Sequence, residues 1–170
     1  MRYALSFGVV GALFVCGSAG TATSGPFCKG SQLVAALTAV PGSAGAGNIV
    51  YRLRVTNTAA GACFVSGLPA GKLLGANGTA LPTNVRAAQR GIGTAARIVL
   101  LHGNAARADA RFSPDVPGPG EPVSGKACEP KAYVFRVTAP GGGTVDAPLQ
   151  PPTPVCEHGT LSFSLYTAAL

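Results

Sequence analysis

Apolar and polar residues alternate along much of the chain, and this period of two is typical of strands that bury one face. The clearest segment is NIVYRLRVTN, residues 48–57, in which an apolar side chain takes every second position from Ile49 onward. Successive side chains of a strand point to opposite faces, so we expect Arg52 and Arg54 on the solvent side. The pattern therefore predicts a strand with one buried and one charged face.

Three further segments alternate in the same way. They are AARADARF at residues 105–112, AYVFRV at 132–137 and GTLSFSLY at 159–166. In the last of these, Tyr166 is expected to point outward together with the serines. The predicted inward residues are Ala106, Ala108, Ala110 and Phe112 in the first segment, Tyr133, Phe135 and Val137 in the second, and Leu161, Phe163 and Leu165 in the third.

Many short strands without a helical pattern predict an all-β protein of about seven to nine strands, arranged as an antiparallel β-sandwich. The 24 Gly and 14 Pro residues agree with a chain of many turns. Asn77-Gly78 favours a tight hairpin of type I′, whose two central residues need positive φ. A Pro/Gly-rich stretch at 113–125 predicts a long loop that either connects strands or carries recognition. Weaker candidate strands are 32–40, 63–66, 72–74, 96–101 and 144–149.

The N-terminal segment has the layout of a secretory signal peptide. Arg2 precedes an apolar run at residues 4–15, and small residues follow. The run is about a dozen residues long, shorter than the roughly 20 that a membrane-spanning helix needs. We expect cleavage after Ala22, with Ala19 as the rival position. Removal of a leader at 1–22 leaves residues 23–170, the size of one ordinary domain.

The cysteines divide between this leader and the mature chain. Lipidation of Cys16 is an alternative, but Leu, Phe and Val precede it, where lipoprotein signals usually have Gly, Ala or Ser. The remaining cysteines are even in number, as expected for disulfides in an oxidising compartment. Four cysteines allow three pairings, among which the sequence does not choose by itself. We favour the two sequential pairs, Cys28 with Cys63 and Cys128 with Cys156.

The chain is moderately basic, with 13 Lys and Arg against 6 Asp and Glu and a formal net charge of +7. The arginines are scattered singly along predicted strands, whereas nucleic-acid binding typically uses a clustered patch with groove-reading or stacking groups. Together with export, this argues against a nucleic-acid partner. Attraction to anionic envelope polymers or lipid head groups stays open.

The run LRVTNTAAGACFVSGLPAGKLLGANGTAL, residues 53–81, resembles an uncharacterised secreted family, the domain of unknown function 4232, common in actinobacteria. The shared pattern is an alternating strand that ends in Asn57-Thr58, followed by Cys63, Gly67-Leu68-Pro69 and a hairpin at 72–81. The similarity continues through residues 100–112, Cys128 and Val155-Cys156.

The chain departs from that pattern at two places. Leu68 stands where an aromatic residue is usual, and His102-Gly103-Asn104 stands where Pro-Gly is common. The resemblance implies an immunoglobulin-like sandwich in the cell envelope or outside the cell. It brings no known catalytic residue to transfer.

Motifs for catalysis and metal binding do not fit the residues present. A nucleophile elbow needs Gly-x-Ser-x-Gly, and the segment at 41–45 is offset from that frame by one residue. Cys156-Glu157-His158 groups three metal-binding residue types, but the cysteine is expected in a disulfide and neighbouring strand residues alternate faces. We expect no cofactor and no metal. His102 and His158, the two histidines, have no neighbouring triad pattern.

Two hypotheses for the function follow. The first is a non-enzymatic module of the cell envelope or extracellular space that binds a protein, glycan or lipid partner. The second is a small secreted hydrolase with an unrecognised site, which would need two acids, or a histidine with an acid, to meet in a pocket.

Overall fold

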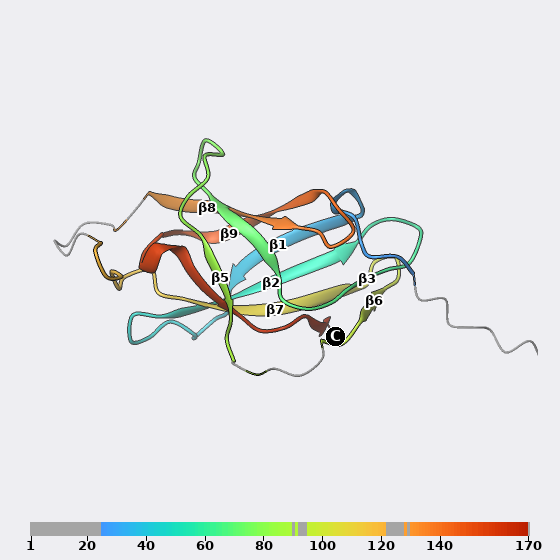
Figure 1. Ribbon diagram of the computed structural model, residues 1–170, viewed down its shortest axis with the longest axis horizontal. Coiled ribbons are helices and arrows are strands. Elements are labelled where there is room, and N and C mark those ends of the chain that lie inside the picture. The colour runs from blue at the N-terminus through green and yellow to red at the C-terminus, as the bar shows by residue number, and fades with distance from the viewer. Residues whose placement is uncertain (1–24, 90, 92–94, 122–127, 129, 170) are drawn as a thin grey trace, which may run out of the picture.

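The computed structural model describes residues 25–89, 91, 95–121, 128 and 130–169 (Figure 1). The predicted leader at 1–22, with Cys16, lies outside these residues. Eleven strands and two single-turn 3-10 helices make up the regular structure, which confirms the all-β class. The elements are η1 (Gly30–Gln32), β1 (Leu33–Ala39), β2 (Ile49–Asn57), β3 (Cys63–Val65), β4 (Ala70–Leu74), β5 (Asn84–Ala87), β6 (Ile98–Leu100), β7 (Ala105–Phe112), β8 (Lys131–Thr138), β9 (Thr144–Pro154), η2 (Glu157–Gly159), β10 (Thr160–Phe163) and β11 (Thr167–Ala169).

Most of the strands belong to one continuous sheet that folds over on itself. Its order is β4-β8-β9-β1-β2-β7-β10-β5, with β11 also paired to β7, while β3 and β6 form a separate two-stranded sheet. Phe135 of β8 and Phe163 of β10 meet in the interior, with ring centroids 5.5 Å apart. The two end strands also approach each other, because the backbone N–H of Leu73 in β4 donates to Thr83 Oγ1, just before β5, at 2.8 Å. The body is therefore shaped like a sandwich or barrel around a single core.

The strand pairing is not antiparallel throughout. β1 lies parallel to β9, with Leu37 opposite Leu149, and β5 lies parallel to β10. Parallel partners need a long crossover between them, and both pairs are far apart in the sequence. The local pattern of alternation carries no information about such distant partners, so it did not predict these two parallel pairs within the otherwise antiparallel arrangement.

Two further strands account for the difference from the expected seven to nine. β5 and β11 were not predicted, because each is short and neither alternates clearly between apolar and polar residues. Both take their place through pairing with longer strands, β5 along β10 and β11 along β7.

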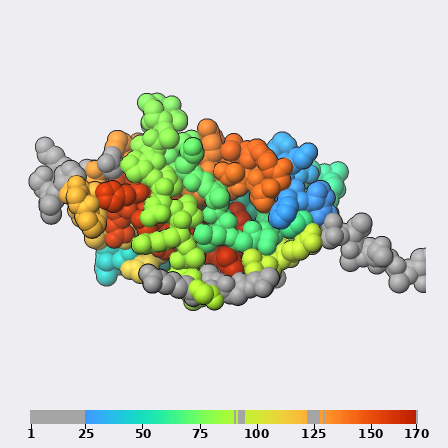
Figure 2. All heavy atoms as spheres, in the orientation of Figure 1, coloured from blue at the N-terminus to red at the C-terminus, as the bar shows by residue number. Residues whose placement is uncertain are grey.

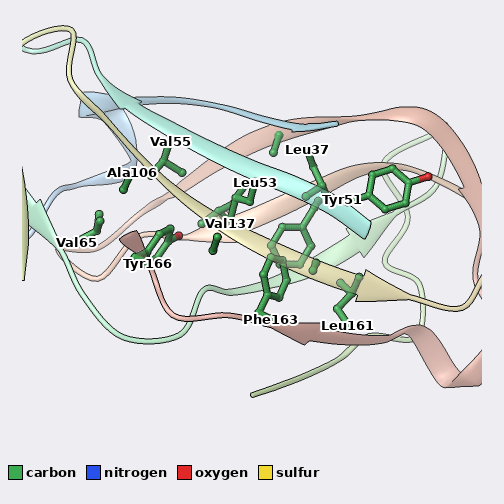
Figure 3. Packing of buried hydrophobic residues seen from close by; sticks show 14 of the residues in the cluster. Leu37, Tyr51, Leu53, Val55, Val65, Ala106, Val137, Leu161, Phe163 and Tyr166 are labelled. Carbon is green, nitrogen blue, oxygen red and sulfur yellow. The ribbon is translucent and has the colours of Figure 1, made fainter. Parts of the chain in front are cut away.

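The buried faces of β2 and β7 follow the predicted alternation (Figure 3). Tyr51 and Leu53 of β2 lie in the core with Phe163 and Leu161 of β10. Much of the β7 contribution consists of alanines, which let the two layers approach closely. The fully buried side chains of largest volume are Tyr51, Phe112, Phe135, Phe163, Leu37, Leu53, Leu73, Leu100, Leu161, Val55, Val65 and Val137.

Two predicted facings are wrong near the C-terminus. A bulge between Ala132 and Val134 shifts the register of β8 against β9, so Ala132 is buried and Tyr133 is 41% exposed. β10 ends at Phe163, and the alternation is lost in the irregular segment that follows. Tyr166 is consequently buried, and its backbone N–H donates to the carbonyl of Gly67 at 3.1 Å.

The hairpin after β4 forms at the expected place but with another turn. The N–H of Gly78 donates to the carbonyl of Gly75 at 3.0 Å, and Gly78 has φ of 77°. Asn77 is not among the described residues with positive φ, so this is a three-residue loop ending in a left-handed glycine, not a type I′ turn. The hairpin stands out from the body as the green protrusion at the top of Figure 2.

Candidate anion-binding site

The outward surface of β1, β2, β7, β10 and β5 carries a concentration of positive charge, and we call it the arginine face. Its residues alternate with the buried core residues of the same strands. Among the described residues of these strands, the only acidic side chain is Asp109. The arginines of the face are Arg52, Arg54, Arg86, Arg107 and Arg111.

Asp109 is fully engaged by one of these arginines. Arg52 donates through Nε and Nη2 to the two carboxylate oxygens of Asp109, each at 2.8 Å. These hydrogen bonds from Arg52, together with the charges of Arg52 and Arg107, hold the pKa of Asp109 below its usual range despite its partial burial. Arg136 binds Asp146 in the same bidentate way on β8 and β9, outside the arginine face. Both guanidinium forks are therefore neutralised within the protein.

Arg54 and Arg107 have a different environment. They are directly opposite each other on β2 and β7, and their next neighbours across the sheet are Ala36 of β1 and Thr167 of β11. Within the described part of the chain, neither guanidinium lies within 4.0 Å of a carboxylate. Two like charges that face each other on adjacent strands destabilise a sheet. The charge of Arg107 also attracts Asp109, but that carboxylate is bound by Arg52, so the row carries more positive charge than its neighbours offset.

The second unbalanced row is Arg86-Ser162-Arg111, which runs across β5, β10 and β7. Ser162 is paired with Arg86 on one side and with Arg111 on the other. The row lines a polar hollow of about 130 Å³. The other residues that line it are Asn48, Ser113, Glu157 and Thr160.

Hydrogen bonds orient both arginines of this row through a single nitrogen. Arg111 Nε donates to Asn48 Oδ1 at 2.8 Å, and Arg86 Nε donates to Ser162 Oγ at 3.3 Å. A guanidinium has five N–H donors. No acceptor within the described residues takes a hydrogen bond from the terminal nitrogens of either side chain. Their forks are thus held in place, and four N–H donors on each are available to an anion.

A buried carboxylate that no sequence pattern marks lies next to this hollow. Glu121 accepts hydrogen bonds from the backbone N–H groups of Gly118, Glu157 and His158 at 2.5, 2.9 and 2.7 Å. Glu157 and His158 have φ of 48° and 52°, and successive left-handed residues of this kind form a nest of N–H groups that suits an anion. Burial raises the pKa of Glu121, but these hydrogen bonds and His158 outweigh it, so its pKa is lowered.

The two histidines lie in different parts of the molecule. His158 Nδ1 is 3.5 Å from Glu121 Oε1, and its Nε2 is 3.0 Å from the carbonyl oxygen of Pro119. Both ring nitrogens therefore face acceptor oxygens. His102 lies near the other end of the sheet, where its Nδ1 is 3.3 Å from the carbonyl oxygen of Ala59. No group of three or more His, Cys, Asp or Glu side chains that could hold a metal occurs within the described residues.

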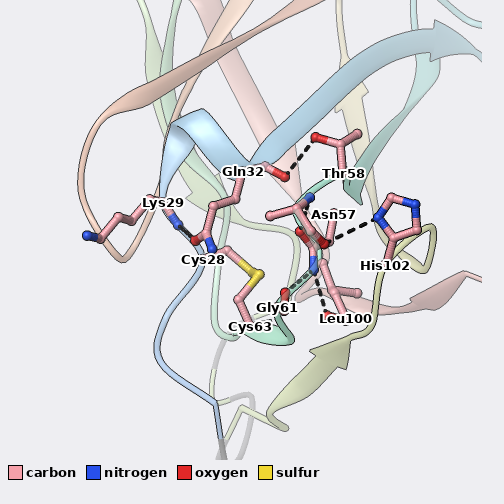
Figure 4. The surroundings of a disulfide bond; sticks show 10 residues. Cys28, Lys29, Gln32, Asn57, Thr58, Gly61, Cys63, Leu100 and His102 are labelled. Atoms are coloured by element: carbon pink, nitrogen blue, oxygen red, sulfur yellow. Dashed lines mark hydrogen bonds between the residues drawn. A yellow bond between two sulfur atoms is a disulfide. The ribbon is translucent and has the colours of Figure 1, made fainter.

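Four cysteines form the two predicted disulfides, Cys28–Cys63 and Cys128–Cys156. The first joins the segment before η1 to β3 (Figure 4). The second joins Cys128, which precedes β8 in the sequence, to Cys156, the residue before η2. It thus lies beside the nest that holds Glu121.

A family model matches residues 28–166, from the first disulfide cysteine to the buried Tyr166. The chain belongs to the family described as domain of unknown function (DUF4232). The predicted resemblance is therefore confirmed. No curated protein and no solved structure matches the chain, and the immunoglobulin-like subclass stays a prediction. The described part of this DUF4232 domain contains no helix long and apolar enough to cross a membrane.

The structure explains the Asn57-Thr58 element of the DUF4232 pattern in this chain. Asn57 is fully buried, and its Nδ2 donates to the carbonyls of Gly61 and Leu100 at 2.8 and 3.0 Å (Figure 4). Its Oδ1 accepts from the N–H of Ala59 at 3.0 Å. One amide thus joins the end of β2, the loop before Cys63 and the end of β6, which makes its role in the described structure architectural.

The anion-binding residues follow from the sequence only in part. Arg111 is on a predicted strand and was expected to point outward. Arg86 is on β5, which no alternation marked, and its position beside Ser162 depends on a parallel pairing between distant segments. Glu121 lies in a Pro/Gly-rich loop, where a single acidic residue carries no recognisable pattern.

Proposed function

We propose that this DUF4232 protein is a non-enzymatic binding module of the cell envelope or extracellular space, and that its arginine face holds an anionic glycan polymer. The observation that carries the proposal is the Arg54-Arg107 pair, two like charges kept directly opposite each other without a carboxylate partner in the described structure. Such a pair costs stability in the free protein. An anion bound between the two guanidiniums would attract both of them and so offset their mutual repulsion.

The placement of the arginines and of a neighbouring hollow on the arginine face suits an extended ligand. The rows of Arg54-Arg107 and Arg86-Ser162-Arg111 share strand β7, where Arg107 and Arg111 lie on the same face, so a chain-like anion can contact both. Next to Arg52 and Arg54, a shallow hollow of about 250 Å³ runs between β1 and β2, lined by small and apolar residues that include Ala36 and Pro41. Such a surface suits the apolar side of a sugar ring, while arginines beside it contact the charged groups of the polymer.

A glycan is favoured over a lipid surface because the arginine face has few apolar anchors. Interfacial binding to a bilayer combines cationic charge with buried apolar side chains. Only Val34 of the exposed large apolar residues in the described structure belongs to the arginine face. The full set is Phe27, Val34, Val99, Leu101, Val116 and Tyr133.

Export is the second part of the proposal. The predicted signal peptide and the two disulfides, which form and persist in oxidising compartments, both support it. An anionic polymer of the envelope would be available to the protein in that location.

The hydrolase hypothesis is less well supported by the same geometry. A histidine and an acid do meet, in His158 and Glu121, which is the arrangement that this hypothesis needs. However, Glu121 already accepts three backbone hydrogen bonds, and both ring nitrogens of His158 face oxygen atoms of the protein. A general base needs a nitrogen within reach of the proton that it takes from the substrate. The pair is better suited to fixing the loop at 113–121 against η2.

The test measures binding of the mature protein to two anionic polymers, alginate and polyglycerol phosphate, with neutral dextran as the blank. We expect both anionic polymers to bind, and binding to weaken as salt screens the charges. The double variant Arg54→Gln with Arg107→Gln should lose at least about tenfold in affinity, as expected for two charged contacts. Lys72→Gln with Lys131→Gln is the matched control, since it removes the same charge from β4 and β8 and should change the affinity less than twofold.

Three results would overturn the proposal. One is equal binding to dextran and to the anionic polymers. Another is an equal loss of affinity in the two double variants, which would mean that net charge alone attracts the polymer. The third is binding to phosphatidylglycerol vesicles in preference to either polymer, which would make a membrane the partner.

A further inference from the structure

We propose that the Arg86-Ser162-Arg111 row is a clamp for one phosphate group, so that the anionic polymer recognised by this domain is a phosphate-bearing one. This inference rests on the proposed function and makes it more specific. It assigns the clamp a role distinct from that of Arg54 and Arg107, which contribute charge along the polymer.

The spacing of the strands determines what fits between the two arginines. Adjacent strands lie about 4.8 Å apart, so Arg86 and Arg111 start roughly 10 Å apart on either side of Ser162. Both side chains line the same hollow of about 130 Å³. That volume exceeds the roughly 10–15 Å³ that one water molecule requires on the same measure, so the hollow has room for one small oxyanion between the two arginines.

The donors around the hollow select a tetrahedral oxyanion over a carboxylate. A carboxylate presents two oxygens in one plane, and a single guanidinium fork already binds both, as Arg52 does with Asp109. Here two forks approach from opposite strands, with the Ser162 hydroxyl between them. A phosphate has three or four oxygens in a tetrahedral arrangement and can accept from both forks and from the hydroxyl at once.

The hydrogen bonds within the row reserve these donors for a ligand. Asn48 Oδ1 accepts from both Arg111 Nε and the hydroxyl of Ser113, and the hydroxyl of Thr160 donates to the carbonyl of Glu157. Those polar groups are occupied. Ser162 Oγ accepts from Arg86 Nε, and no described acceptor takes its own proton, so its O–H remains available.

Glu157 is the one acidic side chain among the lining residues of the hollow. Its carboxylate lowers the positive potential at the clamp without forming an ion pair with Arg86 or Arg111 among the described contacts. Removal of this charge should therefore strengthen the binding of an anion. General attraction to a basic protein would gain as much from Asp115→Asn, which removes an exposed acidic charge outside the lining of the hollow. Only a larger gain for Glu157→Gln than for Asp115→Asn therefore indicates a site at the hollow.

The experiment titrates the ¹⁵N-labelled mature protein with inorganic phosphate at constant ionic strength and follows amide shifts, with acetate as the carboxylate probe. We expect saturable shifts at Ser162 and its neighbours with phosphate, and weaker, non-saturating shifts with acetate. Arg86→Gln and Arg111→Gln should each weaken phosphate binding by about tenfold to a hundredfold, the range for a hydrogen bond to a charged group. Glu157→Gln should tighten it about twofold to fivefold, a fraction of the effect of a nearby charge.

A matched control separates the clamp from the effect of net charge. Lys72→Gln with Lys131→Gln should leave the affinity for inorganic phosphate within about twofold, since these residues lie on β4 and β8 and do not line the hollow. Thermal midpoints of all variants show whether a loss of binding reflects a loss of folding. In the polymer assay, Arg86→Gln with Arg111→Gln should reduce binding of polyglycerol phosphate more than binding of alginate. Phosphatidylglycerol vesicles and glycerol 3-phosphate show whether the phosphate is recognised on a bilayer or in a soluble molecule.

The outcomes separate this inference from the proposed function. If both polymers bind but phosphate produces no saturable shift at Ser162, or if Glu157→Gln weakens the binding, the clamp is refuted and the polymer-binding function stands. If phosphate binds at Ser162 but neither polymer does, the polymer-binding function is refuted and the clamp stands.

Discussion

Arg54 of β2 and Arg107 of β7 lie directly opposite each other in an antiparallel ladder, with no described carboxylate within ion-pair distance of either. Two residues further along the same strands, Arg52 and Asp109 form a bidentate ion pair. Neighbouring rows of one sheet therefore differ in whether their charge is balanced. This contrast gives the first prediction.

Arg54→Thr should stabilise the free protein, because it removes the repulsion from Arg107. The expected gain in the free energy of unfolding is about 0.2–1 kcal/mol, the size of a cross-strand pair interaction. Arg52→Thr is the control on the same strand and face, and it should give no gain because it removes the partner of Asp109. Urea unfolding measures both. Equal gains would mean that threonine simply suits the strand better, and repulsion between Arg54 and Arg107 would not be the cause.

Asn57→Ala should destabilise the domain markedly. The substitution leaves the carbonyls of Gly61 and Leu100 and the N–H of Ala59 without their buried partner. Each unsatisfied buried group costs about 1–3 kcal/mol, and we expect a total loss of at least about 2 kcal/mol. Asn77→Ala is the matched control, since the side chain of Asn77 is exposed in the hairpin and bonds only Thr79 within the described residues. A similar midpoint of unfolding for both variants would refute this role of Asn57.

Glu121→Gln should destabilise the domain at neutral pH and much less in acid. The pKa of Glu121 is lower in the folded protein than its usual value, so the unfolded chain takes up the proton first as the pH falls. Its contribution to stability is therefore complete above the unfolded pKa of about 4.3 and is lost as the pH falls through the lower folded value. The pKa values of Asp109 and Asp146 are also lowered, so these residues contribute to the loss of stability in acid in the wild type and in the variant alike. The effect of Glu121 is therefore the difference in stability between wild type and variant at each pH.

Thermal midpoints at pH 7, 5, 4 and 3 provide the measurement for Glu121→Gln. Asp115→Asn is the control, because Asp115 is exposed on the same loop and receives none of the three backbone hydrogen bonds. A difference between wild type and Glu121→Gln that stays constant over this range would show that the carboxylate charge does not stabilise the loop.

Each disulfide should contribute strongly to stability. The two bonds close loops with sequence separations of 35 and 28 residues, for which loop entropy gives about 3.5–4 kcal/mol each. The whole domain is expected to have only about 5–15 kcal/mol. Reduction of both disulfides should consequently lower the thermal midpoint by many degrees. Replacement of one cysteine pair by alanine should give part of that decrease, and the two pairs should give decreases of similar size. An unchanged midpoint under reducing conditions, or mass mapping that finds four free thiols, would contradict this prediction.

Features that depend on local order along the chain could be predicted from the sequence. Alternation along β2 and β7 predicted which side chains enter the core, because a strand turns successive residues to opposite faces whatever its partner is. The cysteine count indicated two disulfides, although only the structure confirmed the favoured pairing among three, and the segment at 53–81 indicated the family. These properties need only neighbouring residues or a recognisable pattern.

The tertiary structure alone decided which distant strands become neighbours. The parallel pairing of β5 with β10 places Arg86 beside Ser162, and no pattern in either segment encodes that register. The bulge in β8 moves Tyr133 to the surface, and the end of β10 turns Tyr166 inward, because packing and backbone hydrogen bonding override alternation there. A binding site built across three strands depends on these pairings, which arise when the whole core forms and not within any one segment.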